Sequence, residues 1–209
     1  MRAWVATAVA AGLVVVGLVL LAAAVTGTPT GDFTRDPAAL GNLNWYAGSV
    51  SVLNSCVWAV GAALSAFVAW IVPSLRHALV PLAALTALLG ADDALRLHDR
   101  IAPAHGVPEM LIQAFYVLGG AYIAWRLAPW RRGREGEPGR AYLVGCLALA
   151  VSLGTDVIVK EAFLVEDGAK LVGALVWAVI PVGAYSIAAA ERPMAAAAPV
   201  RDQTARAGR

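Results

Sequence analysis

The residues of this chain that could do chemistry are acids and bases set into apolar sequence. One group lies in the run LLGADDALRLHD, which contains Asp92, Asp93, His98 and Asp99. A charge at the centre of a membrane helix costs about 2.5–3.5 kcal/mol on insertion scales, so such residues usually face the bundle interior and mark function. Two adjacent aspartates also need cations, protons or strong hydrogen-bond donors around them. We therefore interpret this segment as part of a functional site.

Two later segments carry the same kinds of residue at the matching ends of their apolar runs. In SLGTDVIVKEAF, Asp156 lies about one helical turn before the run ends, and in VEDGAKLVGALVW, Glu166, Asp167 and Lys170 lie at the start. We expect the three segments to converge at one depth of the membrane and to form one polar site. The candidate residues of this site are Asp92, Asp93, His98, Asp99, His105, Asp156, Glu161, Glu166, Asp167 and Lys170.

This set of side chains suits a metal-dependent hydrolase. Carboxylates with one or two imidazoles bind Mg²⁺, Ca²⁺, Mn²⁺ or iron, and zinc could be held by His98, His105 and an aspartate. The metal could activate water towards an ester, amide or phosphate bond of a lipid-like substrate. Asp93 or Glu166 would act as general base, with Lys170 as a further catalytic group. The predicted ligands of this divalent ion, whose identity stays open, are Asp92, Asp93, His98, Asp99, Asp156 and Asp167.

Two other functions fit the same residues. Intramembrane acids with Lys170 are the usual parts of a proton relay in a transporter, although the opposite halves of the apolar runs have no polar residues to continue a path. Alternatively, pairs such as Glu166 with Lys170 and Asp92 with Arg96, each spaced i,i+4, could form ion pairs. A salt-bridge cluster of this kind would only fix helix packing in an accessory subunit.

The elements that must position these residues are long apolar runs. Of the 209 residues, 60% are hydrophobic and 14% are charged, whereas soluble domains average about 45–50% and 25%. A helix needs about 20 apolar residues to cross the hydrocarbon core. The sequence therefore predicts an all-α integral membrane bundle of about six transmembrane helices in a single domain, residues 1–190. The expected spans are 3–25, 48–72, 78–98, 110–128, 141–159 and 168–189.

Charge indicates how this bundle would lie in the membrane. Arginine is concentrated in the 129–140 connection and in the C-terminal tail, and Arg76 lies between the second and third spans. With six spans these segments share one side, which the positive-inside rule makes the cytoplasm. Both termini would then be cytoplasmic and the polar site would open outward. We expect residues 191–209 to form a disordered cytoplasmic tail.

Composition bears on the partners and source of the chain. A net charge of +2 is too small to imply a nucleic-acid partner. The expected partners are a lipid bilayer and a lipid-like substrate. Arginine far outnumbers lysine, 14 to 2, and with the abundance of Ala, Gly and Val this indicates a GC-rich bacterial genome and a bacterial cytoplasmic membrane. The first span could be a signal peptide, but its length favours a retained helix.

The two polar motifs carry a resemblance. The first motif, Asp92-Asp93-x4-His98-Asp99, resembles the DD-x4-H-E segment of a family of uncharacterised small bacterial multi-pass membrane proteins. The second motif resembles that family's EDG-x-K-x-x-G-x3-W segment and reads Glu166-Asp167-Gly168-x-Lys170-x-x-Gly173-x-x-x-Trp177. The run from Leu53-Asn54 to Trp58 is similar to its second span, so the resemblance covers roughly residues 45–190. It implies a common fold and a common polar site. Asp99 stands where the family more often has Glu, which would shorten the reach of a ligand there.

Overall fold

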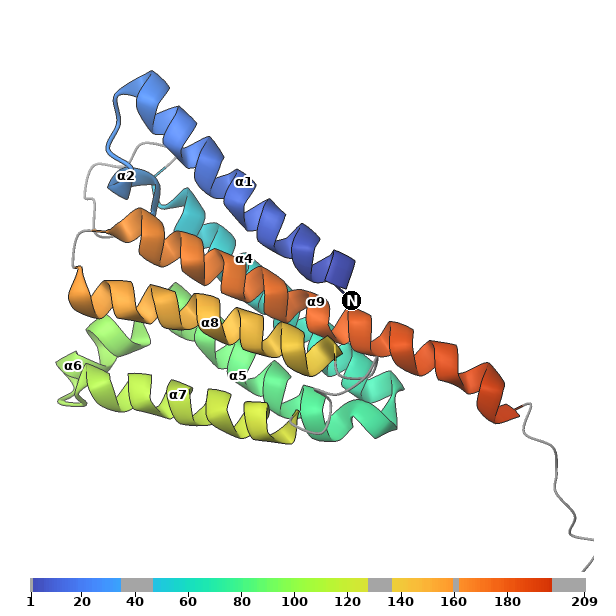
Figure 1. Cartoon of the computed structure of the whole chain (residues 1–209). Helices are drawn as coiled ribbons and strands as arrows, with labels where there is room; N and C mark the ends of the chain where they lie inside the picture. The colour runs from blue at the N-terminus through green and yellow to red at the C-terminus, as the bar shows by residue number, and fades with distance from the viewer. Residues whose placement is uncertain (1, 35–46, 128–136, 160–161, 197–209) are drawn as a thin grey trace, which may run out of the picture.

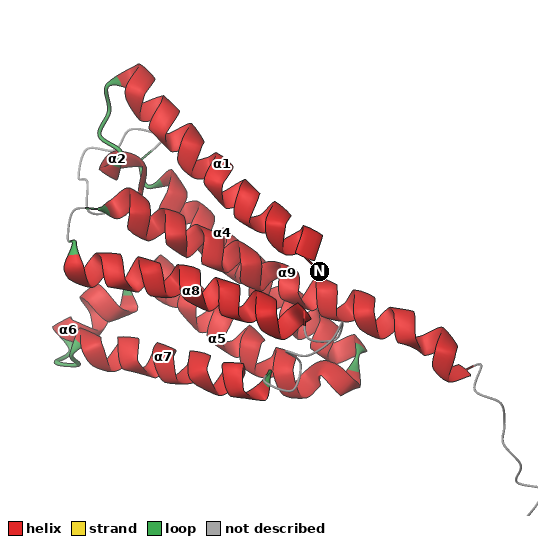
Figure 2. Cartoon of the chain, in the orientation of Figure 1, coloured by secondary structure: helices red, strands yellow, loops and turns green. Residues whose placement is uncertain are grey.

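The computed structural model describes residues 2–34, 47–127, 137–159 and 162–196, apart from the side chains of Asp99, Val157 and residues 191–196. In these ranges the chain is helical throughout, with short connections and no strand (Figure 2). The long helices are α1 (Arg2–Thr26), α4 (Ser49–Ile71), α5 (Arg76–Leu95), α7 (Glu109–Arg126), α8 (Glu137–Ile158) and α9 (Phe163–Ala196). The short elements are α2 (Gly31–Thr34), α6 (Ala102–Ala104), the 3₁₀ turn η1 (Pro73–Leu75) and the π-helical turn η2 (Leu97–Ile101).

The long helices lie side by side in one bundle (Figure 1). α9 packs against α4 and α8, α4 packs against α5, and α1 covers α9 from outside. The end of α8 and the start of α9 lie at the same end of the bundle as α6, whereas the N-terminus of the chain lies towards the other end. This arrangement places all three polar segments at one end.

Four helices are long and apolar enough to cross a membrane: Arg2–Thr26, Ser49–Ile71, Pro73–Leu95 and Phe163–Ala190. The all-α prediction is confirmed, but six spans are not shown. α7 and α8 are not among these four helices; charged residues stand at both ends of α7, and Arg140 and Asp156 lie within α8.

The outward faces of the bundle are apolar, as expected for helices that face lipid. On α1 and α7, large apolar side chains stand exposed rather than packed inside; they include Leu13, Val14, Leu18, Leu21, Met110, Leu111, Phe115 and Leu118. Since exposed apolar patches of this extent are rare on soluble monomers, the surface supports the membrane assignment independently of helix length.

Some helix boundaries differ from those expected from sequence. The span predicted over 78–98 ends at Leu95, because Arg96 takes a left-handed conformation that stops the helix. The span predicted over 168–189 is part of a longer helix that begins at Phe163. With 34 residues, α9 is about 51 Å long and projects beyond the bundle (Figure 1). It includes the first residues of the predicted disordered tail, and residues 197–209 of that tail lie outside the described residues.

Aromatic side chains fill the middle of the bundle. Trp177 of α9 stacks on Tyr142 of α8, with ring centroids 4.8 Å apart, and meets Trp58 of α4 edge to face at 5.9 Å. The Trp177 indole donates a hydrogen bond to the Tyr142 carbonyl at 3.2 Å, and the Tyr142 hydroxyl donates to the Gly120 carbonyl at 2.8 Å. These contacts tie four helices together.

Candidate functional site

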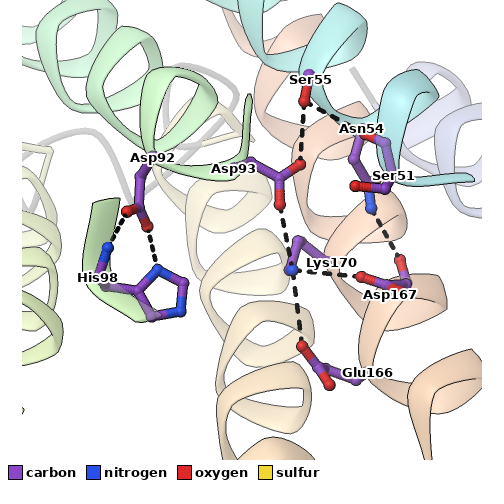
Figure 3. Close-up of polar contacts among 9 residues, drawn as sticks. All are labelled: Ser51, Asn54, Ser55, Asp92, Asp93, His98, Glu166, Asp167 and Lys170. Carbon is purple, nitrogen blue, oxygen red and sulfur yellow. Dashed lines mark hydrogen bonds and ion pairs between the residues drawn. The ribbon is translucent and has the colours of Figure 1, made fainter. Parts of the chain in front are cut away.

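The structure brings the polar ends of α5, α8 and α9 together (Figure 3 shows the α5 and α9 contacts). The adjacent aspartates of α5 point to different partners: Asp92 faces His98, and Asp93 faces Lys170 of α9. One helical face cannot hold both directions, because successive residues are about 100° apart around a helix. Both aspartates find partners because the end of α5 lies between α4 and α9 on one side and the η2 turn on the other.

Lys170 is the centre of the larger cluster. Its ammonium lies 3.3 Å from Asp93 Oδ1, 3.3 Å from Asp167 Oδ1 and 3.7 Å from Glu166 Oε1. All four side chains are largely shielded from solvent. One cation thus serves three carboxylates and links α9 to α5. We therefore expect Lys170 to be needed for stability, since removing one partner of a buried ion pair is costly.

Two polar residues of α4 extend this cluster. The Ser55 hydroxyl lies 3.4 Å from Asp93 Oδ2 and 3.3 Å from the Ser51 carbonyl, and can donate its proton to either. The Asn54 amide donates to the backbone carbonyl of Asp167 at 3.4 Å. Asn54 is fully buried. These contacts join α4 to the same polar group.

Asp92 and His98 form a second, separate pair. Asp92 Oδ1 accepts the backbone N–H of His98 at 2.8 Å, and Asp92 Oδ2 lies 2.6 Å from His98 Nδ1. The Asp92 side chain is 7% exposed and the His98 side chain is 27% exposed. Tyr116 of α7 is a further electrostatic neighbour of Asp92. One carboxylate oxygen therefore contacts the imidazole, and the other binds the backbone of the same residue.

Both groups line one pocket. Its volume is about 440 Å³, within the range of about 300–1,000 Å³ typical of small-molecule sites. The polar lining residues lie at one end of the pocket, and they are Asp92, Asp93, His98, Gln113, Tyr116, Ser152, Asp156, Glu166 and Lys170. The remaining lining is apolar and comes from all five of α4, α5, α7, α8 and α9; it includes Trp58, Leu85, Leu89, Val117, Ala121, Ala124, Leu143, Leu149, Leu153 and Trp177.

The other predicted site residues are placed as follows. Asp156 lines the pocket and interacts electrostatically with Glu166 and Asp167. His105 is exposed, and its Nδ1 lies 2.8 Å from the Ile101 carbonyl; it is not among the pocket-lining residues. The side chain of Asp99 and the whole of Glu161 lie outside the described residues.

The metal-binding prediction is not tested by this arrangement. In the part of the chain that the structure describes, no three His, Cys, Asp or Glu side chains are grouped to hold a metal ion. Between Asp93, Glu166 and Asp167, the positive charge is the ammonium of Lys170. The predicted metal ligands therefore stay a prediction.

Sequence reasoning missed Asn54, Ser55, Gln113, Tyr116 and Ser152. These side chains are uncharged in their usual forms, whereas charge within an apolar run was what marked the predicted site residues. The sequence held a usable signal for two of them, because Asn54 and Ser55 are adjacent polar residues within a mainly apolar run. Tyr116 carried no such signal, since tyrosine is common at the ends of membrane helices.

Comparison with known proteins gives a family and no activity. Residues 6–182 match the model of a family described as a domain of unknown function (DUF8692). This range contains both polar motifs and the whole pocket. No curated protein and no solved structure matches the chain.

Proposed function

Because the chain belongs to the DUF8692 family, a domain of unknown function, we propose a function from its own site: the protein binds a lipid-like molecule in the pocket and hydrolyses it at the polar end. The observation that carries this proposal is the two-part lining of the pocket, with acids, His98 and Lys170 at one end and an apolar body beyond. An amphipathic molecule is the ligand that matches both parts.

The pocket is long enough to hold an extended hydrocarbon chain. Its lining on α7 runs from Gln113 to Ala124, and on α9 from Glu166 to Trp177, which is about 16 Å along each helix. Apolar side chains occupy the far part of this path. A hydrocarbon chain lying there would bury apolar surface, worth about 25 cal/mol per Å².

The polar end favours a neutral headgroup over a phosphate. Asp92, Asp93, Asp156 and Glu166 line it, against the positive charges of Lys170 and of His98 when protonated. An added phosphate would meet this surplus of negative charge at short range and in low dielectric, where like charges repel strongly. We therefore expect a neutral acyl ester or amide at the point where the lipid meets the site.

The lipid would enter sideways from the bilayer. Val117 of α7 and Leu143 of α8 both line the pocket, yet they are 56% and 41% exposed. The pocket therefore reaches the surface of the bundle between α7 and α8. This surface would face the hydrocarbon core, so a lipid could enter without crossing water.

The proposal includes six spans with both termini in the cytoplasm. α7 and α8 have 18 and 22 residues, or about 27 and 33 Å, close to the ~30 Å of the hydrocarbon core. Both run alongside the four candidate spans in the same bundle (Figure 1). With the arginine-rich segments inside, the polar end of the pocket lies near the outer surface.

The test uses the full chain in phosphatidylcholine vesicles that contain monooleoylglycerol, a neutral acyl ester. Oleic acid release is measured by mass spectrometry, and lipid retained on the repurified protein is measured alongside. Ala124→Phe fills the apolar part of the pocket, whereas Ala114→Phe adds the same ring to the exposed face of the same helix. We expect release by the parent and by Ala114→Phe, and at least a tenfold loss of release and retention in Ala124→Phe. No release by the parent, or full activity of Ala124→Phe, would overturn the proposal.

A further inference from the structure

We infer that Asp92 and His98 are the proton-transfer pair of this site, with His98 as the catalytic base and Asp92 as its positioning residue. This inference rests on the proposed function and assigns the base to His98, where sequence reasoning assigned it to Asp93 or Glu166. It also assigns the other acids a different task, because they are gathered around Lys170.

The geometry selects one form of the imidazole. A carboxylate accepts hydrogen bonds, so the 2.6 Å contact between Asp92 Oδ2 and His98 Nδ1 requires a proton on Nδ1. In the neutral ring the lone pair is then on Nε2. The second bond, from the His98 backbone N–H to Asp92 Oδ1 at 2.8 Å, fixes the carboxylate relative to the ring. Asp92 therefore sets both the tautomer and the orientation of the base, the role of the carboxylate in hydrolase triads.

The backbone is bent to make this contact. Arg96 has φ 57° and is the only residue other than glycine with positive φ in the described ranges. Its N–H closes α5 on the Asp92 carbonyl at 2.7 Å, and the next residues form the π-helical turn η2. This reversal returns His98 to Asp92, six residues earlier. Left-handed non-glycine residues and π turns are both costly and concentrate at functional sites.

The pair also lies where a substrate would be. Asp92 and His98 both line the pocket at its polar end, together with Tyr116 of α7. The Lys170 ammonium, in contrast, is held between three carboxylates. Of the two polar groups, the Asp92–His98 pair is therefore the one suited to proton transfer, because it contains an imidazole with one carboxylate partner.

The reaction step balances with water as the only co-reactant. His98 Nε2 takes a proton from water while the water oxygen bonds to the acyl carbon of the ester. The carbon–oxygen bond to the alcohol part then breaks, and the departing oxygen takes the proton back from His98. The products are a fatty acid and an alcohol, and His98 returns to its starting form. Acid–base assistance of this kind contributes about 10²–10⁴-fold to a rate.

The first test is activity. With monooleoylglycerol in phosphatidylcholine vesicles, we expect His98→Gln and Asp92→Asn each to lower kcat by about 10²–10⁴-fold, with KM little changed. His98→Ala should recover part of its activity when free imidazole is added. His77→Gln, at the other end of α5, is the matched control and should behave as the parent does.

The second test determines which ring nitrogen of His98 carries the proton. In ¹⁵N spectra of histidine-labelled protein, assigned by difference from His98→Gln, we expect the Nδ1–H form in the parent. In Asp92→Asn we expect a shift to the Nε2–H form, because an amide N–H₂ would then face Nδ1. An Nε2–H form in the parent overturns the inference, whatever the activity. An active parent whose His98→Gln variant is equally active overturns it too and leaves the proposed function standing, whereas an inactive parent refutes the proposed function itself.

Discussion

The ammonium of Lys170 on α9 lies 3.3 Å from Asp93 Oδ1 on α5, although the two residues are 77 positions apart in the chain. This contact joins the two helices that carry the polar motifs. It also converts a group of acids that would otherwise repel one another into a connected cluster. Stability and metal affinity should therefore both depend on this one cation.

Replacing Lys170 by Met should destabilise the protein. The variant leaves three carboxylates without their cation, so we expect the free energy of unfolding to fall by about 3 kcal/mol, the lower end for breaking a buried pair. The four side chains keep between 11% and 22% of their exposure, so water still screens the charges and argues against a larger value. Denaturant unfolding in detergent measures the change. The Lys170→Arg variant keeps the positive charge, so its free energy of unfolding should fall less than that of Lys170→Met.

A double-mutant cycle tests whether the pair itself is responsible. Asp93→Asn combined with Lys170→Met should cost less than the sum of the single changes, because residues in one ion-pair network couple by about 0.5–3 kcal/mol. Additive losses would show that Lys170 acts without Asp93.

Lys170→Met should also raise the affinity for a divalent cation. Without the ammonium, Asp93, Glu166 and Asp167 present oxygen ligands of the kind that Mg²⁺, Ca²⁺ and Mn²⁺ prefer. Elemental analysis after Mn²⁺ exposure and dialysis should find more metal in the variant than in the parent. Stoichiometric metal in the parent, lost in an Asp92→Asn/Asp93→Asn variant, would instead support the ligand set predicted from sequence.

The crossing of α8 and α9 should be sensitive to a single methyl group. A Cβ at Gly145 would overlap the indole of Trp177, so Gly145→Ala should lower stability by about 1–3 kcal/mol, as overpacking usually does. Gly154, on the same helix, has open space where a Cβ would stand. Gly154→Ala should therefore be neutral or stabilise by up to about 1 kcal/mol. Equal effects of the two changes in thermal unfolding would contradict the close approach.

Cysteine accessibility distinguishes six spans from four. In a background without Cys56 and Cys146, single cysteines replace Ser74, Ala104 and Gly133 in turn. With six spans, a membrane-impermeant maleimide should label intact cells only at position 104. If α7 and α8 do not cross, position 133 should be labelled together with position 104. Labelling at position 74 but not 104 would reverse the proposed orientation.

Much of the fold could be read from local sequence. Hydropathy over windows of about 20 residues located the long apolar helices, because burial in lipid depends on composition more than on partners. The same reading placed Asp92, Glu166 and Lys170 at one end of the bundle, since depth follows from position along a helix. Four of the six expected spans are helices long and apolar enough to cross a membrane, and the full count of six stays a prediction.

Only the tertiary structure decided which side chains meet. The spans are apolar on nearly every face, so they have no clear hydrophobic stripe from which to infer rotation, and rotation decides whether Asp93 faces Lys170 or lipid. The return of His98 to Asp92 depends on a left-handed Arg96 that no local preference favours. The pocket depends on five helices at once. The sequence by itself determined the helices and the depth of the charges, whereas packing decided their pairing, since pairing is set by contacts between residues far apart in the chain.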